Sequence, residues 1–153
     1  FIRGYVHPDD QAQGEVLYIE DSRVVALATR RMMEKHGLTV LHDISVEDAL
    51  ARLETARVQG CVGADVVLTD VTLKGDLTGG DLLREIRTAY GYGKGQLPVL
   101  VMTGDDNPEN QAKLIQAGAN DLVVKPVEER LLITKLLFQL RVSRHLRARA
   151  NPG

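Results

Sequence analysis

Five polar residues in this chain stand directly behind short apolar segments of strand length. They are Glu20 and Asp21 after residues 16–19, Asp70 after 66–69, Thr103 after 99–102 and Lys125 after 122–124. If the apolar segments are parallel strands, these side chains emerge at the carboxyl edge of one sheet, where open α/β sheets place their ligand sites. Three carboxylates, one hydroxyl and one ammonium group at such an edge suit a divalent cation and a phosphoryl group.

Each of these residue types has a chemical reason to be there. Mg²⁺ prefers hard oxygen ligands, which Glu20, Asp21 and Asp70 would supply, and without a cation three clustered carboxylates would repel one another. Asp70, on the predicted central strand, is also the best candidate for a nucleophile that accepts a phosphoryl group as an acyl phosphate. Because phosphoryl transfer depends on positioning and charge neutralisation, Lys125 would supply an ammonium and Thr103 a hydroxyl donor to the phosphoryl oxygens.

The hydrophobic pattern predicts the elements that position these residues. Apolar runs of strand length alternate with amphipathic segments of helix length, which is typical of successive βα units. Five such units, joined by right-handed crossovers, assemble into an α/β fold with a doubly wound, five-stranded parallel sheet. In the strand order 2-1-3-4-5 the first and third strands are neighbours, which brings Glu20, Asp21 and Asp70 to one place.

Cap residues mark where two of the helices begin. Ser22 is a good N-cap for the helix after the first strand, in which Val25, Ala28 and Met32 share the face that we expect to be buried. The pair Asn107-Pro108 marks the start of the helix after the fourth strand, because proline favours the first helical position.

The composition is typical of a single soluble domain. Of the 153 residues, 44% are hydrophobic and 26% are charged. No apolar stretch approaches the roughly 20 residues that span a bilayer, and no secretory signal stands at the start, so we expect no membrane partner. Cys61 is the only cysteine, which excludes an intrachain disulfide and fits a reducing, cytoplasmic location.

Charge and composition divide the chain into three segments. We interpret residues 1–14 as a linker or upstream segment and residues 15–140 as the α/β domain. Residues 141–153 contain four arginines and no acidic residue; we interpret this basic tail as a helical linker to an output domain outside this sequence, or as a dimer contact. The rest of the chain has more acidic than basic residues, which argues against direct nucleic-acid binding by the domain.

Four motifs resemble those of the receiver domains of two-component response regulators, and the resemblance covers about residues 15–140. The motifs are Tyr18-Ile19-Glu20-Asp21-Ser22, Val67-Leu68-Thr69-Asp70, Val101-Met102-Thr103-Gly104 and Val124-Lys125-Pro126, in the family's order and spacing. The resemblance implies a flavodoxin-like fold, with Asp70 as phosphoacceptor, Thr103 as switch hydroxyl and Lys125 as phosphate partner. It also implies a cis bond before Pro126, and Mg²⁺ held by Glu20, Asp21, Asp70 and the main-chain carbonyl of Thr72.

Two positions depart from the pattern of that family. Members usually carry an aromatic residue three positions before the lysine, where the ring turns inward as the threonine engages phosphate; this chain has Leu122. The departure predicts an output surface that switches more modestly or by a different route. After the phosphoacceptor, members usually have Met-Pro, whereas this chain has Leu73-Lys74, which adds a charge near the site.

These residues favour a phosphorylation-dependent signalling switch and not a turnover enzyme. Its partners would be a sensor histidine kinase or phosphotransfer protein and an output domain or partner protein, with a homodimer as a further option. One alternative is a phosphorylation-independent pseudo-receiver that acts as a binding module. Another is a phosphohydrolase of the haloacid-dehalogenase type, but residues 70–72 lack the second aspartate that would serve as its general acid.

Overall fold

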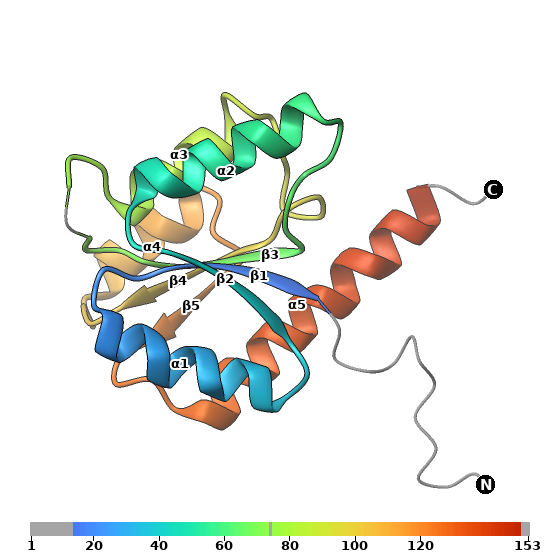
Figure 1. Ribbon diagram of the computed structural model, residues 1–153. Coiled ribbons are helices and arrows are strands. Elements are labelled where there is room, and N and C mark those ends of the chain that lie inside the picture. Colours follow the sequence, from blue (N-terminus) through green and yellow to red (C-terminus); the bar gives the residue numbers. More distant parts are fainter. Residues whose placement is uncertain (1–13, 74, 151–153) are drawn as a thin grey trace, which may run out of the picture.

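Five parallel strands form one sheet in the order β2-β1-β3-β4-β5, as the sequence predicts (Figure 1). The computed structural model describes residues 14–73 and 75–150, and the side chains as far as residue 144. The strands are β1 (Glu15–Ile19), β2 (Thr39–Asp43), β3 (Val66–Asp70), β4 (Val99–Thr103) and β5 (Asp121–Val124). The doubly wound parallel sheet that the alternating pattern predicts is therefore confirmed, and so is the flavodoxin-like fold that the resemblance implies.

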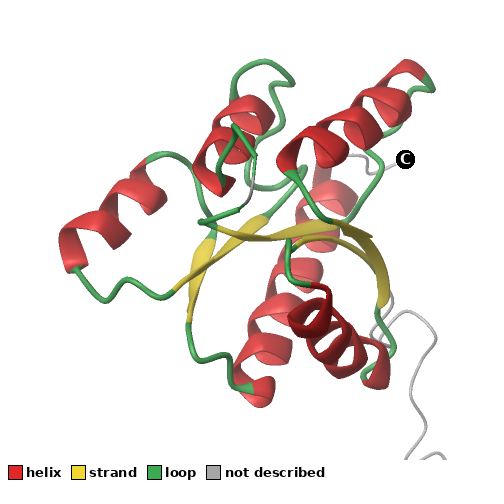
Figure 2. Ribbon diagram, turned by 60° about the vertical axis from the view of Figure 1, so that its left-hand side comes forward, coloured by secondary structure: helices red, strands yellow, loops and turns green. Residues whose placement is uncertain are grey.

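One helix follows each strand, and the helices cover both faces of the sheet. They are α1 (Arg23–Lys35), α2 (Val46–Val58), α3 (Gly79–Arg87), α4 (Pro108–Gln116) and α5 (Glu129–Ala150). Helices α2, α3 and α4 lie on one face, and α1 and α5 lie on the other (Figure 1). Figure 2 shows the same three layers, with the strands in the middle and helices on either side.

The sheet has a hydrophobic core on each of its faces. The core beneath α2 and α3 contains Leu17, Ile19, Leu53, Leu82, Ile86 and Val101. The core beneath α1 and α5 contains Tyr18, Met33, Leu68, Met102, Leu132 and Leu136. The central strands β3 and β4 are buried along their whole length, which is why both read as continuous apolar runs. Two covered faces leave the strand ends as the place where a polar pocket can open.

The predicted buried face of α1 is wrong by one residue. The buried positions are Ala26, Thr29 and Met33, whereas Val25 is 46% exposed. Residues 24–28 are all apolar, so the first turns of the helix are compatible with either face. The polar side chain of Thr29 is buried in the structure. A prediction that places only apolar residues on the buried face cannot find this arrangement. Ser22 caps the helix as predicted, accepting a hydrogen bond from the amide of residue 25.

A guanidinium group at the end of α3 holds the polypeptide segments around β4 and β5 together. Arg87 donates to the main-chain carbonyls of Tyr92 (3.0 Å), Leu97 (2.8 Å) and Gly118 (3.0 Å), and to Oδ1 of Asn120 (2.8 Å). Its partial burial lowers the pKa of the guanidinium, but four acceptors compensate for the water that it loses. The junction between α4 and β5 is thereby tied to the end of α3.

Candidate functional site

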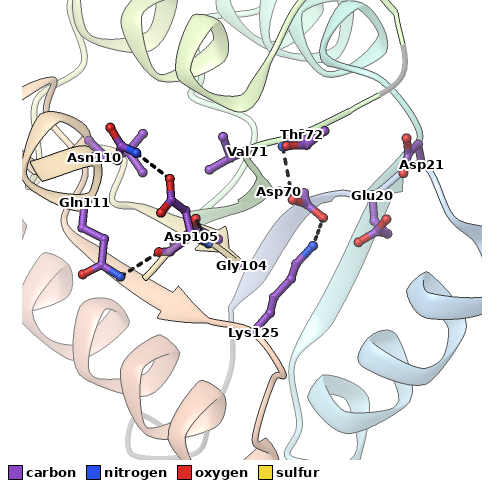
Figure 3. Close-up of a pocket in the computed structure, with 12 residues that line it drawn as sticks. Glu20, Asp21, Asp70, Val71, Thr72, Gly104, Asp105, Asn110, Gln111 and Lys125 are labelled. Atoms are coloured by element: carbon purple, nitrogen blue, oxygen red, sulfur yellow. Dashed lines mark hydrogen bonds and ion pairs between the residues drawn. The ribbon is translucent and has the colours of Figure 1, made fainter. Parts of the chain in front are cut away.

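A pocket of about 900 Å³ opens at the carboxyl edge of the sheet. All six residues for which the sequence predicted a role in phosphoryl or metal binding line it: Glu20, Asp21, Asp70, Thr72, Thr103 and Lys125. Figure 3 shows that Asp70 and Lys125 point toward each other in the middle of this pocket, with Glu20 and Asp21 to one side. Residues up to 105 positions apart in the chain thus meet at one edge of the sheet.

The strand register explains why these side chains lie level with one another. On β1 and β3, the residue before Glu20 pairs with the residue before Asp70. On β4 and β5, Thr103 pairs with the residue before Lys125. Parallel strands in register end at the same edge, so the side chains that follow them are delivered to the same place.

The Asp70 carboxylate is nearly buried and is paired with a cation. Asp70 is 5% exposed, and its Oδ2 forms an ion pair with Nζ of Lys125. Its Oδ1 lies 3.3 Å from the amide nitrogen of Thr72, which donates a hydrogen bond to it. A buried carboxylate needs such partners in place of the water that it loses. Both oxygens of the Asp70 carboxylate therefore have a donor, and the side chain still lines the pocket.

Glu20 is a second nearly buried carboxylate, 4% exposed. Its Oε2 accepts a hydrogen bond from the amide of Ser22 at 3.1 Å. Its Oε1 is buried and has no hydrogen-bond partner among the described residues. Burial, and then the negative charge of Asp70, raise the pKa of the Glu20 carboxyl above its usual value. Both effects would be relieved by a cation next to Oε1.

The carboxylates fit a magnesium ion, although they are not gathered into a complete ligand set. Within the described residues, no three His, Cys, Asp or Glu side chains are close enough together to form a ready metal site. The Asp70 carboxylate is paired with Lys125. Mg²⁺ usually binds through one or two carboxylates and keeps several waters. Oε1 of Glu20, which has no partner among the described residues, and the Asp21 carboxylate on the rim of the pocket could supply these carboxylate ligands.

Thr103 ends β4 and begins the loop to α4. It is 5% exposed, and its Oγ accepts a hydrogen bond from the amide of Asp105 at 3.0 Å. A Cβ atom at Gly104 would meet nothing within 4 Å, so the space beside this residue is open to the pocket. The open space agrees with the prediction that a phosphoryl group can approach the backbone after Thr103.

The sequence did not predict that α4 contributes side chains to this pocket. Nδ2 of Asn110 donates to the Asp105 carboxylate at 2.6 Å, and Nε2 of Gln111 donates to the Asp105 carbonyl at 2.9 Å. The amide of Asn107, and then Asn110, lower the pKa of the Asp105 carboxyl. The cap at Asn107 was a usable signal, because it starts α4 a few residues after Thr103 and so places the first turn beside the pocket.

Three further sequence expectations concern the neighbourhood of the site. The Lys125–Pro126 peptide bond is cis, as the resemblance implied. Leu122 is 9% exposed and belongs to the core beneath α2 and α3, so a buried aliphatic side chain occupies the position of the family's aromatic residue. Lys74 lies outside the described residues, as do residues 1–13 and the side chains of the basic tail beyond residue 144.

The doubly wound sheet and the acidic pocket at its carboxyl edge are those of a signalling receiver. The sequence model of the response regulator receiver domain matches residues 16–137, and the chain belongs to this family. Within the described residues, no helix combines the length and the apolar character that crossing a membrane requires.

Curated relatives and solved structures agree with this assignment. The transcriptional regulatory protein CseB of Streptomyces coelicolor is 31% identical over 129 residues, which cover 84% of this chain and 50% of CseB. A putative two-component system response regulator/GGDEF domain protein is 28% identical with a TM-score of 0.74, over 85% of this chain and 50% of that one. Chemotaxis response regulator CheY4 of Vibrio cholerae is 25% identical with a TM-score of 0.71, and the match covers 84% of this chain and 99% of CheY4.

The relatives differ from this chain in length. The chain spans about half the length of the curated relatives that it matches first. The part of this chain that matches them is its receiver domain.

Proposed function

We propose that this receiver domain is a phosphorylation-dependent switch in which Asp70 accepts a phosphoryl group from a histidine kinase or phosphotransfer protein. The observation that carries the proposal is the Asp70 carboxylate itself. It is nearly buried, ion-paired with Lys125, and still lines an open pocket at the sheet edge. A structural carboxylate would gain nothing from facing that pocket, whereas a phosphoacceptor needs a route by which the donor reaches it.

Each residue at the sheet edge has a task in this reaction, and Asp70 has two. A carboxylate oxygen of Asp70 attacks phosphorus, the bond from phosphorus to the donor nitrogen breaks, and its electron pair leaves with the donor imidazole. The Lys125 ammonium then pairs with a phosphoryl oxygen, and the Thr103 hydroxyl donates to another. Glu20, Asp21, Asp70 and the carbonyl of Thr72 would hold Mg²⁺, which neutralises part of the phosphoryl charge when it is bound.

The product is a change of state and not a released compound. The acyl phosphate biases an equilibrium between two conformations of the domain, and a partner that prefers one of them reads the change. Because α5 continues to residue 150, a linked output domain or a second copy of the chain is the natural reader. We place the protein in the cytoplasm, with no direct contact between this domain and nucleic acid.

Phosphorylation by a small phosphodonor tests the proposal directly. Purified protein is incubated with phosphoramidate and Mg²⁺, and the fraction that carries an added phosphoryl group is read by intact mass. We expect one phosphoryl group on the wild type, none on Asp70→Asn, and none on the wild type when EDTA removes the metal. Asp76→Asn, an exposed aspartate in the loop after β3, is the matched control and should behave as wild type.

The phosphorylation-independent binding module is the second candidate, and Leu122 is the observation that favours it. A buried leucine cannot perform the inward turn of an aromatic ring. Absence of any phosphoryl adduct on the wild type, together with absence of Mg²⁺ binding by calorimetry, would refute the switch and leave this module as the better account.

A further inference from the structure

The acidic pair Glu20 and Asp21 lies just beyond the last residues that pair between β1 and β2. Ile19 ends β1 and pairs with Asp43, the last residue of β2. The amide of Glu20 still donates to the carbonyl of Asp43 at 3.0 Å. The ladder between the two strands stops at this bond, so the peptide that joins Glu20 to Asp21 needs a further contact to hold its orientation.

The imidazole of His42 supplies that contact. Its Nε2 lies 2.8 Å from the main-chain oxygen of Glu20. Because a carbonyl oxygen can only accept a hydrogen bond, Nε2 must carry the hydrogen and donate it. The carbonyl of Glu20 and the amide of Asp21 belong to one planar peptide unit. The hydrogen bond from His42 therefore orients the link between the two carboxylate residues.

His42 is itself held by its neighbours. Tyr18 is fully buried, pairs with His42 across the strands, and has its ring centroid 5.5 Å from that of the imidazole. The next residue, Asp43, is tied to α2, because Arg52 donates to both of its carboxylate oxygens, at 2.9 and 3.0 Å. Two parallel hydrogen bonds between a guanidinium and a carboxylate fix geometry well. The end of β2 is therefore a firm support for the His42 side chain.

We propose that His42 is a positioning residue for the magnesium site, which acts on the main chain of Glu20 and so holds the Glu20 and Asp21 carboxylates in place. The inference rests on the proposed function and concerns its metal requirement. Mg²⁺ demands near-ideal octahedral geometry, so small displacements of its ligands weaken binding. Oε1 of Glu20 is buried and has no partner among the described residues, so its place depends on the main chain that His42 orients.

A role of His42 in folding alone would have a different consequence. The loss of a hydrogen bond at the end of an edge strand lowers stability whether or not metal is present. Loss of orientation at the Glu20–Asp21 peptide instead raises the Mg²⁺ concentration that the site requires. Asp70 and Lys125 stand at the ends of β3 and β5, so phosphoryl transfer at saturating Mg²⁺ should proceed as in the wild type.

Substitution of His42 by glutamine and by methionine separates the hydrogen-bond donor from the rest of the side chain. The two replacements have nearly the same length, but only glutamine has an N–H group that can donate to the carbonyl of Glu20. The Kd for Mg²⁺ is measured by titration of the full chain, followed by amide NMR shifts. We expect the Kd of His42→Met to rise about tenfold, the lower end of the effect of losing a partner behind a metal ligand, and that of His42→Gln to stay within about twofold of the wild type.

The rate of phosphoryl uptake from phosphoramidate, read by intact mass at increasing Mg²⁺, gives a second readout. For His42→Met, the Mg²⁺ concentration at half-maximal rate should rise about tenfold, and the maximal rate should equal that of the wild type. Urea unfolding in EDTA shows that each variant is folded and measures its stability without metal. His42→Leu repeats the test as a second variant without a donor. His36→Leu, which removes an exposed histidine at the C-cap of α1, is the matched control and should leave the Kd unchanged.

The possible results separate the role of His42 from the function on which it rests. A Kd for Mg²⁺ that is the same in His42→Met, His42→Leu and the wild type would overturn the inference and leave the proposed function standing. Equal weakening in His42→Gln and His42→Met would also overturn it, because the donor would then not matter. Failure of the wild type to bind Mg²⁺ and to take up phosphate would overturn the proposed function, and this inference with it.

Discussion

Gly79 is the residue whose replacement should disturb Asp70 most directly without touching its side chain. It begins α3, and a Cβ atom placed on it would lie 2.1 Å from the main-chain oxygen of Asp70. The same Cβ would lie 3.0 Å from the Asp70 carbonyl carbon and 3.1 Å from Cα of Val71. All three atoms belong to the backbone and cannot rotate away. Alanine at this position must therefore push the end of β3 and the start of α3 apart by more than an ångström.

The expected cost follows from two opposing effects. Overpacking a close contact costs about 1–3 kcal/mol, while replacing glycine by alanine in a helix contributes about 0.5–1 kcal/mol in the stabilising direction. We expect Gly79→Ala to lower the free energy of unfolding by about 1–2 kcal/mol. The neighbouring Gly80→Ala should be neutral or slightly stabilising, because its Cβ would meet only Oγ1 of Thr78, at 3.6 Å.

Urea unfolding followed by circular dichroism measures the stability of both variants, and the rate of phosphoryl uptake by intact mass measures the site. Since the displaced carbonyl belongs to the phosphoacceptor, uptake by Gly79→Ala should slow by roughly tenfold or more, and uptake by Gly80→Ala should not change. If Gly79→Ala is as stable as the wild type and takes up phosphate at the same rate, close packing at this junction is not what positions Asp70.

Two further predictions concern interactions away from the pocket. Arg87→Ala leaves four acceptors without their donor and should lower the free energy of unfolding, measured in urea, by about 3 kcal/mol or more. Arg84→Ala removes only an exposed ion pair with Asp81 and should lower it by a few tenths of a kcal/mol. Equal losses of stability in the two variants would contradict this account. Hydrogen bonds from Lys35 and then His36 lower the pKa of the Glu129 carboxyl in the folded protein. These bonds therefore stabilise the fold at a pH above the pKa that Glu129 has in the unfolded chain, and the stabilisation is lost as the pH falls through the lower pKa of the folded protein. The melting temperature of Glu129→Gln should therefore lie below that of the wild type at pH 7, and the two should be equal below about pH 4. A difference in melting temperature that grows in acid would show that the carboxylate is not the stabilising group.

The sequence by itself determined which strands and helices form, and at which edge of the sheet the functional side chains lie. Strand and helix periods are local, so the alternation of apolar runs was enough to predict five βα units. The strand order followed from the flavodoxin-like arrangement, in which Glu20, Asp21 and Asp70 lie together. The polar residues behind the strands needed only that topology to meet at one edge. For Asp70, Thr103 and Lys125, position in the chain therefore predicted position in space.

Only the tertiary structure decided how those residues pair. Asp70 binds Lys125 and does not complete a three-carboxylate cluster, and Asp105 is held by side chains from α4. The buried face of α1 likewise depends on packing, since the first turns are apolar on both faces and the face that is buried includes the polar side chain of Thr29. Periodicity records which residues can face inward, but contacts between distant segments depend on distances of a few tenths of an ångström, which only the packed chain sets.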